Sequence, residues 1–215
     1  EKFSSFTINR PLVFIVANNS YDCLAGYVGL LRANAVVALI NESIHESVWN
    51  DLVLKFKPAF IYQPSNLFQC SKVWNEKINF GNYVFYETNI EIDYKINSDL
   101  SLLLMTSGST GSPEFVRLSQ NNIISNTKAI CEYLKISKND RAITTLPISY
   151  SYGISIINTH LFMGASLILT DASIMEKKFW ELINRHKVTT FGGVPYTFEM
   201  LKKLKFEKIS IPSIK

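Results

Sequence analysis

Short apolar runs alternate with amphipathic stretches along most of this chain, and that alternation limits the folds open to it. Leu12–Ala17 is a short apolar run, Tyr21 to Ala33 has apolar residues at helical spacing, and Val36–Ile40 is again short and apolar. A helical pattern over Val48–Phe56 and a strand over Ala59–Tyr62 continue the series. A strand-helix-strand series pairs its strands in parallel through right-handed crossovers.

The alternation weakens from Phe68 to Asp99, where only Tyr83–Tyr86 predicts a strand, and then restarts. The restarted part predicts strands over Leu100–Met105, Arg141–Leu146, Ala165–Thr170 and Val188–Phe191, and helices over Gln120–Leu134, Gly153–Met163, Lys177–His186 and Tyr196–Leu204. We therefore expect an α/β protein whose alternating strand-helix units form mostly parallel sheets covered by helices. Its expected subdomains are residues 1–98 and 99–215.

Composition excludes several functional classes. Hydrophobic residues make up 47% of the chain and charged residues 19%, which argues against global disorder. The net charge of +4 is mild, and the lysines near the end of the sequence predict a solvated helix face. No basic motif interleaved with aromatic residues occurs, so we expect no nucleic-acid partner. No run approaches the roughly 20 apolar residues of a membrane span.

The cysteines and histidines are scattered along the chain, and no CxxC pair occurs. They are Cys23, Cys70, Cys131, His45, His160 and His186. Neither a disulfide framework nor a metal site is therefore expected. Reduced thiols predict a cytoplasmic protein.

The stretch Thr106–Pro113, which reads Thr-Ser-Gly-Ser-Thr-Gly-Ser-Pro, follows an apolar strand without a break. Its two glycines allow amide N–H groups to converge on an anion, and its hydroxyls add further donors. Gly108 and Gly111 are three residues apart with no Gly-Lys-Ser/Thr after them, which excludes the Walker loop. A flexible linker is the alternative that composition permits, but the position between a strand and a predicted helix favours a phosphate loop.

Thr106–Pro113 resembles the signature loop of the adenylate-forming superfamily, which comprises acyl-CoA synthetases, non-ribosomal peptide synthetase adenylation domains and luciferases. Leu146–Gly153 (Leu-Pro-Ile-Ser-Tyr-Ser-Tyr-Gly) is similar to the family's Leu-Pro-x-x-His/aromatic segment, which opens a helix beside the acyl pocket. Gly193–Pro195 is similar to the family's Val-Pro element. Order and spacing agree with the family, and the resemblance covers most of the chain.

The resemblance implies the large N-terminal domain of an ATP-dependent ligase. Such a ligase joins a small-molecule carboxylate to the α-phosphate of ATP and passes the acyl group to a thiol, either of CoA or of the phosphopantetheine arm of an acyl carrier protein. Mg²⁺ would be bound through the phosphates. The residues implied to hold the β- and γ-phosphates are Thr106, Ser107, Gly108, Ser109, Thr110 and Gly111.

The resemblance also implies residues of the acyl pocket. Tyr150 matches the His/aromatic position, and Gly192 and Gly193 would let the backbone approach the acyl group. A core aromatic and a tight turn after a strand are the respective alternatives. The apolar residues of the helix after Tyr150 could face either the pocket or the core, and fatty, aromatic and amino acids all remain open as substrates.

The chain departs from the family pattern in two ways. The family usually has lysine and glycine after the loop's proline, but Glu114 and Phe115 stand here. A carboxylate repels a triphosphate, so we expect weaker ATP binding unless the loop tip points away, and Arg117 is a candidate replacement charge. A scaffold module that kept the fold without catalysis is the alternative.

The second departure is that the family's Tyr-Gly-x-Thr-Glu segment, ribose-binding aspartate, hinge and C-terminal domain with its catalytic lysine do not occur in these 215 residues. No catalytic residue is therefore assigned, and both subdomains are expected to be partial. We expect a piece of a longer protein that does not catalyse adenylation alone.

Overall fold

The computed structural model describes residues 10–67, 74–106, 114–209 and 211–214, and it divides into two compact units. Unit 1 extends to Ile123 and unit 2 begins at Ile124. The sequence boundary at residues 98 and 99 precedes this division, because the strand at Leu100 pairs with a strand of unit 1. That pairing joins segments far apart in the chain, so local patterns do not reveal it.

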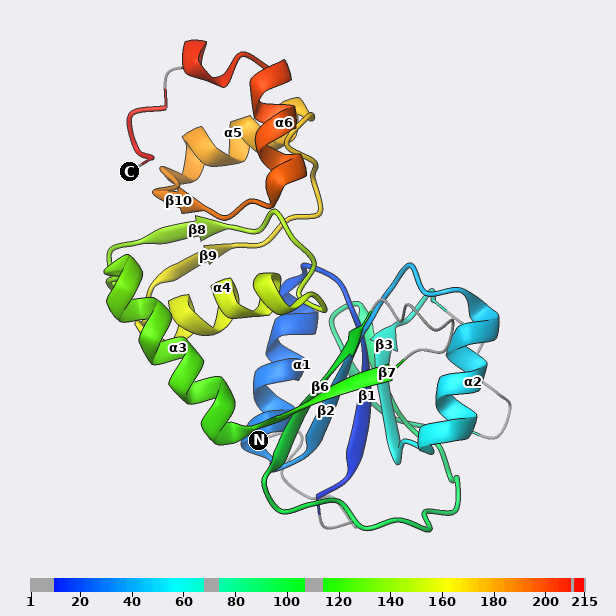
Figure 1. Ribbon diagram of the computed structural model, residues 1–215. Coiled ribbons are helices and arrows are strands. Elements are labelled where there is room, and N and C mark those ends of the chain that lie inside the picture. Colours follow the sequence, from blue (N-terminus) through cyan, green and yellow to red (C-terminus); the bar gives the residue numbers. More distant parts are fainter. Residues whose placement is uncertain (1–9, 68–73, 107–113, 210, 215) are drawn as a thin grey trace. The chain divides into compact units, whose positions relative to one another are not determined.

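Unit 1 is built on a seven-stranded sheet with the order β4-β5-β3-β1-β2-β6-β7 (Figure 1). Its four central strands are parallel to one another: β1 (Leu12–Ala17), β2 (Val36–Asn41), β3 (Phe60–Pro64) and β6 (Leu100–Thr106). Antiparallel strands extend both edges: β4 (Asn75–Phe80), β5 (Tyr83–Glu87) and β7 (Glu114–Ser119). The expected mostly parallel α/β architecture is thus confirmed.

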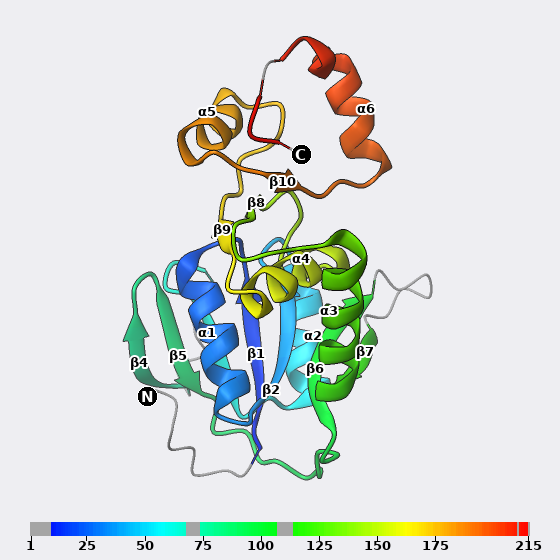
Figure 2. The same ribbon diagram turned by 90° about the vertical axis from the view of Figure 1, so that its left-hand side faces the viewer.

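Helices α1 (Tyr21–Arg32) and α2 (Glu46–Phe56) cover opposite faces of this sheet, as Figure 2 shows. Successive side chains of a strand point to opposite faces, so alternate residues of β1 face α1 and α2. Phe14 packs in one cluster with Trp49 and Leu52 of α2. On the other face, α1 approaches so closely that a Cβ on Gly26 would lie 2.1 Å from the ring of Tyr62.

Unit 2 contains a three-stranded parallel sheet with the order β10-β8-β9. Its strands are β8 (Arg141–Ile143), β9 (Ser166–Ile168) and β10 (Thr190–Phe191). Its helices are α4 (Ser151–Phe162), α5 (Lys177–His186), α6 (Pro195–Lys203) and a 3-10 turn, η1 (Phe206–Lys208), while α3 (Gln120–Leu134) begins in unit 1. A core of Ile143, Phe179, Ile183 and Val188 lies between the sheet and α5.

The sequence missed strands β4 and β7. Glu114–Ser119 (Glu-Phe-Val-Arg-Leu-Ser) forms β7 between the phosphate loop and α3, although the sequence places a helix next after the loop. Its apolar and polar residues alternate, which is a strand signal, but six residues beside a Gly/Ser-rich loop make that signal short. The strands of unit 2 are also shorter than expected. Just after β8 and β9, the Thr144 hydroxyl donates to the Thr170 carbonyl and accepts from the Thr170 amide.

Buried phenols give unit 1 an expected sensitivity to alkaline pH. Burial, with Asp93 nearby, raises the pKa of Tyr94 to about 12, and burial also raises the pKa of Tyr62 and of Tyr83. The folded chain therefore keeps protons that the unfolded chain releases above its ordinary pKa of 10.0. Below about pH 10 these phenols are protonated in both states, and the free energy of unfolding does not depend on them. We expect it to fall as the pH rises from about 10 towards 12, because only the unfolded chain then releases these protons.

Urea unfolding followed by tryptophan fluorescence at several pH values measures this effect. Tyr94→Phe should make the free energy of unfolding decrease less steeply with pH. Tyr196→Phe, at a side chain that is 66% exposed, should leave that pH dependence unchanged. A free energy of unfolding that stays constant up to pH 12 would show that these phenols do not titrate with folding.

Candidate functional site

The β6–β7 pair holds the two ends of the predicted phosphate loop. Thr106 and Glu114 are antiparallel partners, and the Thr106 hydroxyl donates to the Glu114 carbonyl at 3.3 Å. The other loop residues predicted to bind phosphate lie outside the described residues: Ser107, Gly108, Ser109, Thr110 and Gly111. The structure therefore describes the frame of the loop, with Thr106 exposed at the end of β6.

Aromatic packing fixes this frame to the core of unit 1. The ring of Phe115, directly after Glu114, lies 4.9 Å from that of Phe56 and 6.0 Å from that of Phe14. Ring pairs at these separations stabilise beyond the area they bury. The chain after the loop is thus anchored by a residue that stands where the family has glycine.

Glu114 and Arg117 lie on opposite faces of β7. Alternation places Glu114 on the face of its partner Thr106, and Arg117 on the face of Phe115, which packs toward α2. Neither side chain takes part in the ion pairs found among the described residues. Glu114 is exposed and Thr106 shares its face, so a triphosphate held by Thr106 would meet this carboxylate.

The segment from Leu146 to Gly153 forms a tight turn into α4 in unit 2. The amide of Tyr150 donates to the Pro147 carbonyl at 3.0 Å, and Tyr150 caps the helix with extended backbone. A Cβ on Gly153 would lie 2.1 Å from the same Pro147 oxygen, so the turn requires glycine at this position. The Tyr150 side chain is 48% exposed, which excludes the alternative of a core aromatic.

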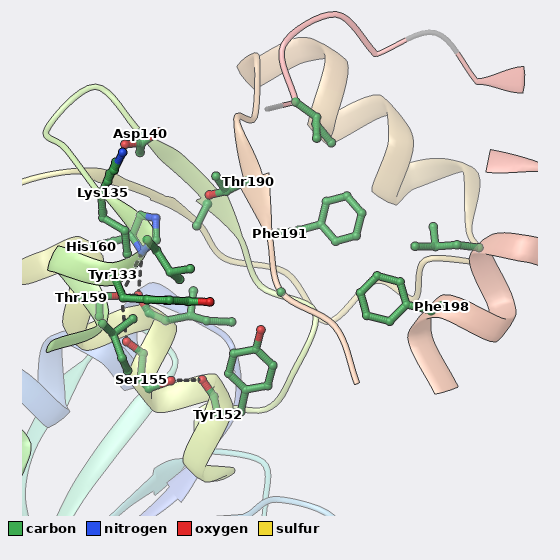
Figure 3. A pocket seen from close by; sticks show the side chains of 18 of the residues that line it. Tyr133, Lys135, Asp140, Tyr152, Ser155, Thr159, His160, Thr190, Phe191 and Phe198 are labelled. Carbon is green, nitrogen blue, oxygen red and sulfur yellow. Dashed lines mark hydrogen bonds between the residues drawn. The ribbon is translucent and has the colours of Figure 1, made fainter. Parts of the chain in front are cut away.

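A cavity of about 1290 Å³ lies within unit 2 among α3, α4, β10 and α6 (Figure 3). Most of its wall is apolar, from residues such as Ile130, Ile156, Phe191 and Phe198. Gly192 also lines it, and a Cβ there would meet Ile156 at 2.6 Å. Tyr150 and Gly193 are not among the residues of its wall.

Sequence reasoning left open whether the apolar residues of α4, Ile156 among them, face the pocket or the core, and Ile156 lines this cavity. It missed the other residues of α4 in the wall, which are Tyr152, Ser155, Thr159 and His160. Their spacing of three and four residues marks one face of a helix, which is the signal that could have found them. The neighbouring Ile154 and Ile157 are buried instead, at 4% and 0% exposure.

The described residues contain no group of three or more His, Cys, Asp or Glu side chains placed to bind a metal ion. Within the same ranges, no helix combines the length and apolar character needed to cross a membrane. Cys23 and Cys131 are buried, and neither takes part in a disulfide bond.

A model of the AMP-binding enzyme family matches residues 9–214, which is nearly the whole chain. The chain belongs to the AMP-binding enzyme family. This adenylate-forming family was expected from the phosphate loop and the two motifs of unit 2, and the match confirms it.

Curated relatives of this AMP-binding chain include CoA ligases. "Acyl-CoA synthetase ALT10" of Alternaria alternata is 33% identical over 118 residues, covering 54% of this chain and 20% of the relative. "Oxalate--CoA ligase" of Saccharomyces cerevisiae is 21% identical over 225 residues, covering 86% of this chain and 41% of the relative. The chain thus spans less than half the length of these relatives.

The fold of this AMP-binding chain is similar to that of "O-succinylbenzoate Coenzyme A Synthetase (MenE) from Bacillus Subtilis", solved in complex with AMP. The TM-score is 0.75 at 20% sequence identity, and the match covers 100% of this chain and 56% of that one. At this identity the likeness shows the fold alone.

Proposed function

We propose that these residues form the N-terminal portion of an ATP-dependent ligase that activates a carboxylate as its acyl-adenylate. The observation that carries the proposal is the Thr106–Pro113 sequence at the end of β6, within a chain matched by the AMP-binding enzyme family over residues 9–214. CoA ligases among the relatives support the same reaction class. Two buried cysteines outside any disulfide support a cytoplasmic location.

The proposed reaction has two steps. A carboxylate oxygen attacks the α-phosphorus of ATP and displaces pyrophosphate, and a thiol then attacks the acyl carbon and displaces AMP. Thr106, Ser107, Gly108, Ser109, Thr110 and Gly111 would hold the β- and γ-phosphates. Backbone amides and hydroxyls in fixed positions catalyse such transfers by orienting the phosphates and neutralising charge, and Mg²⁺ bound through the phosphates would add to that neutralisation.

The acyl group would occupy the cavity of unit 2. Gly192 supports this proposal because it lines the cavity and has no side chain to fill it. Gly193 follows at the start of the turn into α6, and Tyr150, exposed at the start of α4, would gate access. CoA is the proposed acceptor thiol, and the phosphopantetheine arm of a carrier protein is the alternative.

Glu114→Lys is expected to tighten ATP binding about tenfold, since it replaces a repelling charge with an attracting one beside Thr106. Glu91→Lys makes the same charge change at another exposed position of unit 1 and serves as the control. The measurement is the dissociation constant for ATP by calorimetry at low ionic strength. Equal effects of the two substitutions on the dissociation constant would show that Glu114 does not face the phosphates.

Arg117→Ala tests the candidate replacement charge in the same assay. Weaker ATP binding in this variant would assign Arg117 the compensating charge, and an unchanged dissociation constant would reject that role.

The test of the proposal is the acyl-adenylate itself. A chain extended to the length of its relatives, incubated with ATP, Mg²⁺ and a panel of fatty, aromatic and amino acids, should yield an acyl-AMP detectable by mass spectrometry. The isolated 215 residues should yield none. A scaffold that kept only the fold would form no acyl-AMP with any acid, and that result would reject the ligase.

A further inference from the structure

A second cavity, of about 770 Å³, lies within unit 1. It is bordered by the end of α2, by the segment from Tyr94 to Leu100, and by strands β6 and β7. We call it the unit 1 cavity. Its volume is in the range of pockets that bind small molecules, and such pockets combine a mostly apolar wall with a few polar groups that orient the ligand.

The apolar wall of the unit 1 cavity is an incompletely covered part of the core. Leu12, Val36 and Leu103 line it and are buried members of the cluster beneath α2. Four further apolar residues of its wall pack against that cluster but stay partly exposed: Phe56, Ile96, Leu100 and Phe115. Covering such surface with an apolar ligand is favourable, because it removes the surface from water.

Contacts within unit 1 hold the walls of this cavity in place. The Tyr94 hydroxyl donates to the Lys57 carbonyl at 2.7 Å and ties the segment before β6 to the end of α2. The rings of Phe56 and Phe115 lie 4.9 Å apart and join α2 to β7. A cavity that already exists without ligand loses little conformational entropy when it binds one.

Three cations line the unit 1 cavity, and none of them takes part in an ion pair found among the residues that the structure describes. They are Lys55, Lys95 and Arg117. In contrast, Lys57, two residues after Lys55, pairs with Asp93 at 2.6 Å and does not line the cavity. The wall also contains the carboxylates of Asp99 and Glu114, so three positive and two negative charges leave one positive charge in excess.

Two of these cations accompany the aromatic pair of the wall. Lys55 Nζ lies 5.3 Å from the centroid of the Phe56 ring, a separation at which the ring attracts the ammonium group. Arg117 follows Phe115 by two residues in β7 and therefore shares the strand face that packs toward α2. Apolar surface and positive charge thus meet at one place in this wall.

We propose that the unit 1 cavity binds an amphipathic monoanion, a molecule with an apolar body and one negatively charged group. The apolar body would cover the partly exposed core residues, and the anionic group would balance the one positive charge in excess. An amphiphile of positive charge would cover the same apolar surface but add to that excess. This site is separate from the cavity of unit 2, and the inference does not depend on the proposed ligase reaction.

The experiment compares two probes with the same apolar chain and opposite charge, decane-1-sulfonate and decyltrimethylammonium. A sulfonate is not a carboxylate, so its binding is independent of acyl-adenylate formation. Isoleucine-methyl NMR of the 215-residue chain locates the binding, because Ile96 lines the unit 1 cavity and Ile156 lines that of unit 2. At low ionic strength and below micelle-forming concentrations, we expect the dissociation constant read at Ile96 to be about tenfold lower for the sulfonate.

Variants assign this preference to the cations of the wall. Lys55→Gln and Arg117→Gln should each weaken sulfonate binding at Ile96 about threefold, the effect of one exposed ion pair. Lys77→Gln is the matched control, because it removes the same charge from β4, at the opposite edge of the sheet from β7; it should leave the dissociation constant unchanged. Circular dichroism checks that each variant is folded.

Tighter sulfonate binding at Ile96 that weakens in Lys55→Gln or Arg117→Gln, but not in Lys77→Gln, supports the anion site. Equal affinity for the two probes, shifts at Ile156 without shifts at Ile96, or equal weakening in all three variants would overturn it. A shift of Ile96 on raising the protein concentration without any probe would show that a second copy of the chain covers the cavity, and would overturn it too. None of these results depends on the outcome of the acyl-AMP assay.

Discussion

Replacing Gly153 with alanine is expected to lower the free energy of unfolding by about 3 kcal/mol, the upper range for overpacking. In an ordinary helix the same change would stabilise by up to about 1 kcal/mol. Here the added Cβ would lie 2.1 Å from the Pro147 oxygen and 3.1 Å from that of Leu146. Both are backbone atoms, so no side-chain rotation relieves the contact, and the turn into α4 must open.

Gly164→Ala, just after the other end of α4, is the matched control. Gly164 has φ of +64° and nothing within 4 Å of its Cβ position, so alanine there has only the cost of a left-handed backbone, about 1 kcal/mol. Urea unfolding followed by the fluorescence of Trp180 measures both. If Gly153→Ala were no more destabilising than Gly164→Ala, the turn would not depend on glycine.

Phe14→Ala is expected to lower the free energy of unfolding by about 4 kcal/mol, within the range for removing a buried phenylalanine ring. Phe14 is 0% exposed in the middle of β1. Its ring contacts those of Trp49 on α2 and Phe115 on β7, with centroids 6.0 Å away in both cases. The cavity left behind would therefore remove packing contacts both from α2 and from β7.

Leu54→Ala controls for the change of an apolar residue in the same unit. Leu54 is 73% exposed on α2, so its loss should change the free energy of unfolding by less than about 0.5 kcal/mol. Urea unfolding followed by the fluorescence of Trp49, which contacts Phe14, reads out unit 1. A loss below about 1 kcal/mol for Phe14→Ala would mean that the ring is not part of a packed core.

The strand-helix series could be predicted because each element carries its own periodicity. Leu12–Ala17 is apolar at all six positions and is fully buried, and a helix over Gln120–Leu134 agrees with α3. Pairing is not encoded locally. Nothing around Leu100 shows that β6 lies beside β2, so the sequence placed the division before this strand instead of after Ile123.

The motifs located the candidate site, but three-dimensional packing determined which side chains line it. The family motif singled out Tyr150, yet the cavity is lined by Tyr152, two residues later. The helical phase of α4 decides this, and the turn that sets the phase depends on a backbone contact between Gly153 and Pro147.

The most direct test of the central claim is carboxylate-dependent exchange of labelled pyrophosphate into ATP, because it reports the adenylation step alone. With a chain extended to the length of its relatives, we expect exchange with at least one acid of the panel. Replacing Gly108 and Gly111 together by valine should reduce it at least about a hundredfold, as losses of preorganised anion-binding donors do. Exchange that is absent with every acid, or that is unchanged in the folded double variant, would contradict the assignment of Thr106–Pro113 as the phosphate loop of a ligase.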